Sequence, residues 1–524
     1  MLNLRTRRAF LGDVGKGMLI ATIGSAVAAD LELAEAAENA GDEALSFGGL
    51  EGLVCLLQET PIRKLNSVLV EKLRGGTDLK TLTAAGALAN ARTFGGEDYV
   101  GFHTMMALGP AYRMSRELPE NLRPLPVMKV LYRNTNRIQE HGGRTGEVLH
   151  PVDTATSASS PEALNGESLR SAVRAKDVKS AERIFAGIAQ RGADDAFNAL
   201  LVAVQDNTEV HRVVLPYRAW DMLGLIGREH AHTLLRQSVR YCVQAERWPG
   251  AAVRPHDPRT VLPTMMEKFK LMEKTPGTKP ADDVFVEKLS QTIFSSTPEQ
   301  AAEAAASALS EGFSPDVVGE AISLAANQLI LRDQGRTPRD EVSGKPLGSV
   351  HGDSIGVHAC DSANAWRNMA RAASPRNTFA CLILGAFQVA LDRIERGGNF
   401  LNWEPLPLKQ HIDGVKSQDP VELLAQLDEA IRGNLQARAA AIAHRYGQLG
   451  HADRPVFDLM LKYAVSEDGS LHAEKYYRTA SDEFSNTRPA MRWRQVAALA
   501  RVTASEFGRP AAGMTEAREM LQVG

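Results

Sequence analysis

Apolar residues recur at intervals of three and four along almost the whole chain, which is the period of one face of an α-helix. The pattern begins near Leu53 and continues to Phe507, interrupted by Gly-Gly pairs, prolines and short polar runs. No stretch alternates convincingly with the two-residue period of a strand. The pattern therefore predicts an all-α fold, arranged as stacked helical units in a solenoid or toroid-like array.

The expected helices are separated by loops that are rich in proline and polar residues. They cover residues 53–57, 62–73, 79–91, 99–118, 123–140, 169–175, 180–190, 194–204, 213–227, 230–246, 284–294, 298–311, 315–331, 354–373, 377–395, 420–446, 455–465, 473–484 and 489–507. Residues 248–263 read as a Pro-rich loop, and residues 273–283 as a further surface segment.

The helices group into regions that are divided by these loops. We expect helical regions at 47–150, 165–250, 284–400 and 418–510, preceded by a leader at 1–28 and a flexible lead-in at 29–46. Three histidines, one in each of the last three regions, are followed ten residues later by an aspartate: His211 and Asp221, His351 and Asp361, and His472 and Asp482. This spacing predicts internal repeats, although three such matches can also arise by chance.

The N-terminus has the pattern of a twin-arginine export signal. Arg7-Arg8 precede Phe10-Leu11, an apolar run follows from Gly17, and cleavage is expected near Ala28. A basic N-terminal arm is the alternative. The leader predicts recognition by the twin-arginine export machinery and a periplasmic protein, and no later run reaches the eighteen apolar residues of a membrane-spanning segment.

Composition excludes some classes of protein. The net charge of −3 supplies no basic excess for phosphate contacts, so we expect no nucleic-acid partner. The four cysteines form no Cys-x-x-Cys pair, which excludes a zinc ribbon, and they are either disulfide-bonded or buried as free thiols. No phosphate-binding glycine loop, Gly-x-Ser-x-Gly or His-Glu-x-x-His motif is present.

The densest group of reactive side chains lies between Gly348 and Arg367. On a helix, His358 and Asp361 share one face, and His351 could join them if the helix begins early. Imidazole with carboxylate suits iron, manganese, copper or zinc, and the same pair could act as a general base with its orienting acid. A buried His-Asp hydrogen-bond network with no chemistry is the alternative.

Further candidates lie in other regions of the chain. His103 sits in the middle of an apolar helix, and His211 begins another, on which Arg218 could clamp an anionic substrate group. We expect the pocket to be lined by His351, His358 and Asp361 together with His211 and His103, with His472 as a further candidate. His358 would be the base or metal ligand and Asp361 its partner.

Several segments resemble the questin oxidase-like family of all-α proteins. The resemblance rests on the helix 102–108 around His103, the segment 351–361, and the helix 457–465, in which Tyr463 stands where that family's pattern has a histidine. It implies an oxygenase-like reaction on an aromatic or quinoid substrate. Our hypothesis is therefore an exported oxidoreductase with a His/Asp pocket, and the alternative is a non-catalytic helical-repeat binding or scaffold protein of the periplasm.

Overall fold

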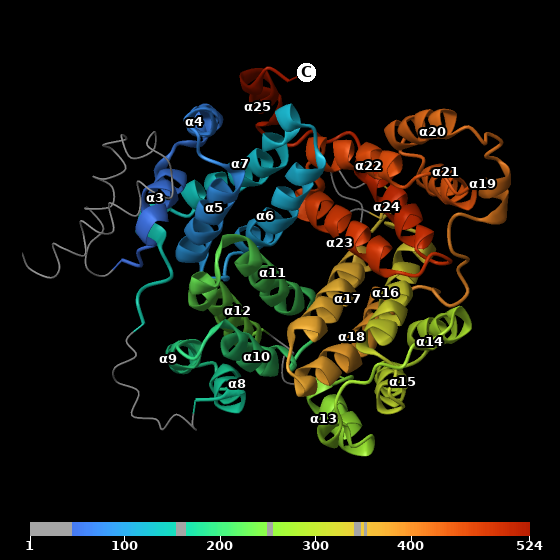
Figure 1. The fold of residues 1–524 in the computed structure, drawn as a ribbon, viewed down its shortest axis with the longest axis horizontal. Helices are drawn as coiled ribbons and strands as arrows, with labels where there is room; N and C mark the ends of the chain where they lie inside the picture. Colours follow the sequence, from blue (N-terminus) through green and yellow to red (C-terminus); the bar gives the residue numbers. More distant parts are fainter. Residues whose placement is uncertain (1–43, 153–163, 249–254, 340–346, 351–353, 524) are drawn as a thin grey trace, which may run out of the picture.

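The structure, a computed structural model, describes residues 44–152, 164–248, 255–339, 347–350 and 354–523. Within these ranges all regular structure is helical, apart from the isolated bridges Lys279–Phe313 and Glu467–Pro510. The prediction of an all-α helical array is confirmed (Figure 1). The proposed export leader and nearly all of the lead-in lie outside the described residues.

The first two helical regions each contribute five α-helices. Region 47–150 contains α3 (Glu51–Glu59), α4 (Ile62–Arg74), α5 (Leu79–Phe94), α6 (Tyr99–Glu117) and α7 (Pro124–Glu140). Region 165–250 contains α8 (Gly166–Arg174), α9 (Val178–Ala189), α10 (Ala193–Val204), α11 (Val210–Ile226) and α12 (Ala231–Ala245).

The second half of the chain is equally helical. It contains α13 (Pro258–Lys268), α14 (Asp283–Ser295), α15 (Pro298–Ser310), α16 (Pro315–Arg332), α17 (Ile355–Ala372) and α18 (Pro375–Arg396). It continues with α19 (Lys409–Asp413), α20 (Pro420–Arg432), α21 (Gln436–Gln448), α22 (Arg454–Ser466), α23 (His472–Asn486), α24 (Trp493–Glu506) and α25 (Met514–Leu521). Short 3-10 turns lie at Gly48–Leu50, Glu120–Leu122, Gly143–Gly146, Arg228–His230, Leu271–Glu273 and Gly469–Leu471.

Two expectations about element boundaries were wrong. Residues 258–263 belong to α13 rather than to a loop, because Pro258 occupies the first helical position, where no N–H is needed, and Asp257 caps the backbone N–H of Arg259. The helix expected at 420–446 is two helices, α20 and α21, and Asn434 between them takes a left-handed φ of 53°.

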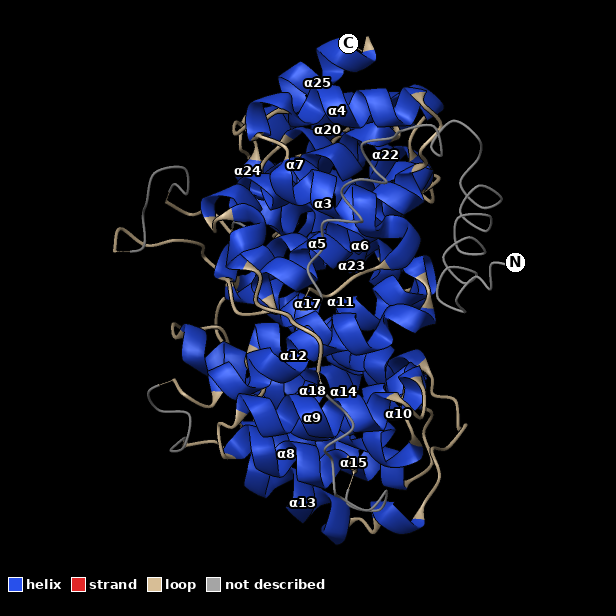
Figure 2. Ribbon diagram, turned by 90° about the vertical axis from the view of Figure 1, so that its left-hand side faces the viewer, coloured by secondary structure: helices blue, strands red, loops and turns tan. Residues whose placement is uncertain are grey.

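Four helices from four different regions surround the centre of the molecule. α6 packs against α11 and α23, and α17 packs against the same two helices, so the four form a closed ring. Figure 1 shows them meeting in the middle, and Figure 2 places α11, α17, α6 and α23 in the middle of the perpendicular view. The other helices pack around this ring.

One described helix, α18, is long and apolar enough to cross a membrane by length and composition. Of its most apolar stretch, 89% is buried inside the structure, where it packs against α15, α16 and α17. The four cysteines are also buried, and all are free thiols.

Candidate functional site

The ring of four helices encloses a cluster of four histidines, one from each helix. His103 (α6) and His211 (α11) form one pair, with Nε2 atoms 3.2 Å apart, and His358 (α17) and His472 (α23) form a second pair at 3.0 Å. The pairs are adjacent: the ring centroids of His103 and His472 are 5.2 Å apart, and those of His211 and His358 are 5.7 Å apart. The fold thus joins residues that are separated by more than a hundred positions in sequence.

Each histidine lies close to the N-terminus of its helix. The four helices run in the same direction away from the cluster. Further along them, Arg113 of α6 pairs with Asp221 of α11, and Asn368 of α17 donates to Asp482 of α23. These four residues each follow a cluster histidine by ten positions. Because four helix N-termini converge on the cluster, the dipoles of the four helices create a positive potential there.

Three of the four imidazoles have a fixed tautomer. Nδ1–H of His103 donates to the carbonyl oxygen of Tyr99 at 2.7 Å, and Nδ1–H of His472 donates to that of Ser470 at 3.1 Å. Nδ1–H of His211 donates to Oε1 of Glu209 at 2.7 Å. In their neutral forms these rings carry a lone pair on Nε2, so the lone pairs of His103 and His211 face each other at 3.2 Å.

Glu209 is the residue that orients His211. As the N-cap of α11, its carboxylate accepts from the backbone N–H groups of His211 and Arg212, and it also accepts from the Tyr241 hydroxyl at 2.7 Å. Burial by itself raises the pKa of Glu209, but the charge and hydrogen bond of His211, with the hydroxyl of Tyr241, lower it to about 2. Glu209 is therefore a carboxylate, which is the usual partner of a metal-bound imidazole.

Two of the four histidines, His103 and His472, are held in the neutral state by their surroundings. Burial and the nearby Lys475 lower the pKa of His103 far below its usual range, and the same two causes act on His472. Burial likewise lowers the pKa of Lys475 to about 8. His103 is thus a poor donor of a proton to the facing Nε2 of His211.

The backbone is strained at the start of α23. Ser470 has a φ of 49° and Leu471 a φ of 66°, and Leu471 carries a branched side chain in this left-handed region. This conformation directs the Ser470 carbonyl back to Nδ1 of His472. Strain of this kind is found where surrounding structure fixes a functional side chain.

A second polar layer lies beyond the histidines and includes two residues singled out from the sequence. Thr479 donates to Asp361 at 2.7 Å and accepts from Nη2 of Arg218 at 3.2 Å. Arg218 is only 2% exposed, and its Nε and Nη1 have no hydrogen-bond partner among the described residues. Arg218 and Asp361 are therefore interior residues that are linked by Thr479.

No three or more His, Cys, Asp or Glu side chains in the described part of the chain are already grouped so that they could hold a metal ion. The histidines instead form two pairs. Two nitrogens that each bind one ion at about 2.1 Å are roughly 3.0–3.4 Å apart. The distance between the two Nε2 atoms of each pair matches this value. To bind one common ion, the two pairs would have to move closer together.

Two cavities reach the cluster from outside, and both are lined by Ile355, His358 and Glu395. Their volumes are about 630 Å³ and 500 Å³. The larger one is also lined by Glu209 and by Asp392, which is 7% exposed and whose Oδ2 has no hydrogen-bond partner among the described residues. Burial, Glu395 and Glu209 raise the pKa of Asp392 well above its usual range, which favours its neutral acid form.

The structure brings together four of the histidines proposed from the sequence: His103, His211, His358 and the further candidate His472. His351 lies outside the described residues. Asp361 is one turn beyond His358 and bonds to Thr479 instead, and neither it nor Arg218 is among the described residues that line the two cavities.

His351, from which the ten-residue spacing was counted, lies outside the described residues. The residue of α17 that matches His211 and His472 is His358, and the residue ten positions later is Asn368. Glu209 and Asp392 were not predicted. Glu209 could have been found as an acidic N-cap two residues before a histidine, and Asp392 as the carboxyl group that directly follows a largely apolar run.

Comparisons with known proteins give no relative. No family model, curated protein or solved structure matches the chain.

Proposed function

We propose that the protein is a metal-dependent oxidoreductase that binds one ion through Nε2 of His103, His211, His358 and His472. One observation carries the proposal: Nδ1–H groups fix the tautomers of His103 and His211 so that two buried lone pairs face each other at 3.2 Å. A cation between such nitrogens turns this repulsion into two bonds. Carbonyl and carboxylate partners on Nδ1 are the usual second layer of ligating histidines.

The donor set favours iron or copper. Neutral imidazoles suit iron, copper, nickel and zinc, whereas manganese prefers carboxylate oxygens. Zinc held by four histidines would have a complete tetrahedral shell, as in structural sites. Iron retains open positions, and the positive helix ends around the cluster favour an anionic further ligand.

The cavities beside His358 support catalysis over a purely structural ion. A volume of about 630 Å³ is within the range of small-molecule sites. Its wall combines Val210, Ile355 and Leu391 with the neutral acid Asp392, so it suits a largely apolar substrate that accepts a hydrogen bond. The resemblance to the questin oxidase-like family supports an aromatic or quinoid substrate and an oxygenase-like reaction.

In this proposal, residues of the chain bind the ion, orient its histidine ligands and donate a hydrogen bond to the substrate. Glu209 holds the ring of His211, and Asp392 donates its proton in a hydrogen bond to a substrate oxygen in the cavity. Arg218, Thr479 and Asp361 stabilise the interior side of the cluster. The ion supplies the electron transfer.

We also propose that the protein is exported, because Arg7-Arg8 and the apolar run that follows match a twin-arginine signal. Twin-arginine export carries folded proteins, which allows the ion to be acquired before transport. We therefore propose a periplasmic protein.

Metal analysis of the purified protein tests the proposal. We expect about one iron or copper ion per chain, and a loss of at least half of it in His103→Gln, His211→Gln and His472→Gln. His451→Gln is the matched control, because His451 lies outside the cluster and bonds to the carbonyl of Gln418. Metal content that is unchanged in all three cluster variants contradicts the proposal.

A non-catalytic helical array is the second candidate. The distance of 3.0 Å between His358 and His472 also fits a hydrogen bond donated by His358 to the bare Nε2 of His472. A chain that binds neither iron nor copper, yet keeps the cluster, would support this candidate. Stoichiometric zinc that cannot be replaced by a redox-active metal would support a structural site.

A further inference from the structure

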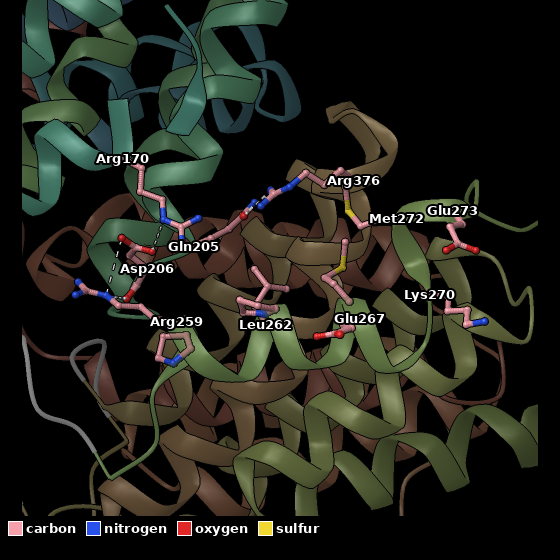
Figure 3. Close-up of a pocket in the computed structure, with 13 residues that line it drawn as sticks. Arg170, Gln205, Asp206, Arg259, Leu262, Glu267, Lys270, Met272, Glu273 and Arg376 are labelled. Carbon is pink, nitrogen blue, oxygen red and sulfur yellow. Dashed lines mark hydrogen bonds and ion pairs between the residues drawn. The ribbon is translucent and has the colours of Figure 1, made fainter. Parts of the chain in front are cut away.

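A separate cavity of about 570 Å³ lies between α13 and the helices α8, α10 and α18. Figure 3 shows Arg376 and Met272 on one side of it, and Leu262 and Glu267 on the other. Among the described residues, none that lines this cavity also lines either of the cavities beside His358. This site is therefore independent of the proposed metal centre.

The cavity has an apolar floor. Leu262 and Met266 of α13 are each 6% exposed, and both turn toward the cavity, while Met272 closes its outer part and is 64% exposed. Pro258 and Pro263 extend the apolar wall along the same helix. Methionines adapt to ligands of varied shape because their side chains are flexible and polarisable.

Three arginines also line the cavity, and two of them form close ion pairs with carboxylates of the protein. Nε of Arg170 lies 3.0 Å from Oδ1 of Asp206, and Nη2 of Arg259 lies 2.6 Å from Oε2 of Glu246. Both arginines are thus ion-paired, although Asp206 is shared with Arg174 and Glu246 with Arg212.

Arg376 is different. Its Nη1 donates to the neutral side chains of Gln205 and Asn377, each at 2.9 Å. The only carboxylate paired with Arg376 in the described residues is Glu167, at 4.0 Å from Nη2. Burial and the nearby Arg170 lower the pKa of Arg376, although it remains a cation at physiological pH.

We propose that this cavity binds an anionic amphiphile, with a carboxylate head on Arg376 and a hydrocarbon portion on Leu262, Met266 and Met272. The guanidinium offers Nη2 to the head, and the start of α18 adds the positive end of a helix to the same place. Glu267 and Glu273 at the other margin repel the head, which fixes its orientation.

Calorimetric titration with decanoate, below its micelle concentration, tests this assignment. We expect saturable binding at one site, weakened about tenfold by Arg376→Gln, because a hydrogen bond to a charged group is removed. Met272→Glu changes an exposed side chain and should weaken decanoate binding by repulsion. Arg183→Gln, on the exposed face of α9, is the control and should leave it unchanged.

The charge of the head group separates this proposal from simple apolar binding. Decanol and decyltrimethylammonium should bind at least fivefold more weakly than decanoate to the natural chain, and Arg376→Gln should narrow that difference. Equal affinity for all three probes, no binding of decanoate, or an equal loss in Arg183→Gln would overturn the proposal. Removal of metal should not alter any of these results.

Discussion

The carboxylate of Glu209 shows how much the cluster depends on single side chains. It caps α11, accepts Nδ1–H of His211, and is itself held by the hydroxyl of Tyr241. A neutral amide at this position would keep the size of the side chain but lose the charge that fixes the imidazole.

We therefore expect Glu209→Gln to weaken metal affinity by about 10- to 100-fold, as is typical for loss of such a partner. Competition with a chromophoric chelator measures this affinity. Glu299→Gln is the control, since Glu299 accepts from His256 outside the cluster. Equal affinity of the natural chain and Glu209→Gln would show that Glu209 acts only as a helix cap.

Asp392 gives the protein a predictable pH dependence. Its pKa is raised in the folded chain, so between about pH 4 and the folded pKa the unfolded chain releases a proton that the folded chain retains. Folding is therefore weakened as pH rises, by at most about 1.4 kcal/mol per pH unit.

The variant Asp392→Asn removes this ionisation. Its stability relative to the natural chain should increase from pH 4.5 to pH 8 in urea denaturation, whereas Asp195→Asn, at an exposed position, should give no such trend. Parallel stability curves for the natural chain and Asp392→Asn would mean that Asp392 ionises normally.

At the scale of elements, α17 is held in place by one close approach and one buried ion pair. A Cβ on Gly356 would lie 2.7 Å from Cγ1 of Ile330 and 2.9 Å from its backbone nitrogen, so α16 and α17 can touch only because residue 356 is a glycine. On the other side, Nη1 of Arg367 lies 2.6 Å from Oε2 of Glu483 on α23. These two contacts set the position of His358 relative to His472.

Gly356→Ala should displace α17 and cost about 1–3 kcal/mol of stability, because backbone atoms cannot yield. It should also weaken metal binding through His358. Gly224→Ala in α11 meets no atom within 4 Å and should instead stabilise the chain by about 0.5–1 kcal/mol. Thermal denaturation and metal titration compare the two, and similar effects of both changes would refute the role of the close approach.

Arg367→Met leaves Glu483 buried without its cationic partner. The substitution should lower the free energy of unfolding by about 3 kcal/mol or more. Most of this loss should return in the double variant Arg367→Met, Glu483→Leu, since no unpaired charge remains. Denaturant titration of both variants measures the difference. A double variant as unstable as the single one would show that packing, and not charge, holds the two helices.

The sequence predicted the positions of the helices better than it predicted which helices pack against each other. Helical period located most of the α-helices and missed three of those described, α13, α19 and α25; at α13 a proline at the first helical position was taken for a loop residue. The close approach at Gly356 was not predictable, because it depends on Ile330 of another helix. The local sequence pattern indicates where helices begin and end, but it does not indicate which helices contact each other.

At the scale of the whole molecule, four helical regions each deliver one histidine to a common centre. The sequence indicated His103, His211 and His358 as members, with His472 as a further candidate, because histidines on apolar helix faces need partners. The spacing of ten residues alone could not distinguish His358 from His351, which lies outside the described residues. The position of Arg218 and Asp361 behind the cluster also required the three-dimensional packing of α11, α17 and α23.

X-ray absorption at the edge of the bound metal tests the central claim most directly. The four-histidine centre predicts about four imidazole nitrogens at roughly 2.0–2.1 Å, with the outer-shell scattering of imidazole rings. His472→Gln should remove one of them. A first shell with fewer than three imidazoles, a shell dominated by sulfur or carboxylate oxygen, or a chain that retains no iron or copper would contradict the account.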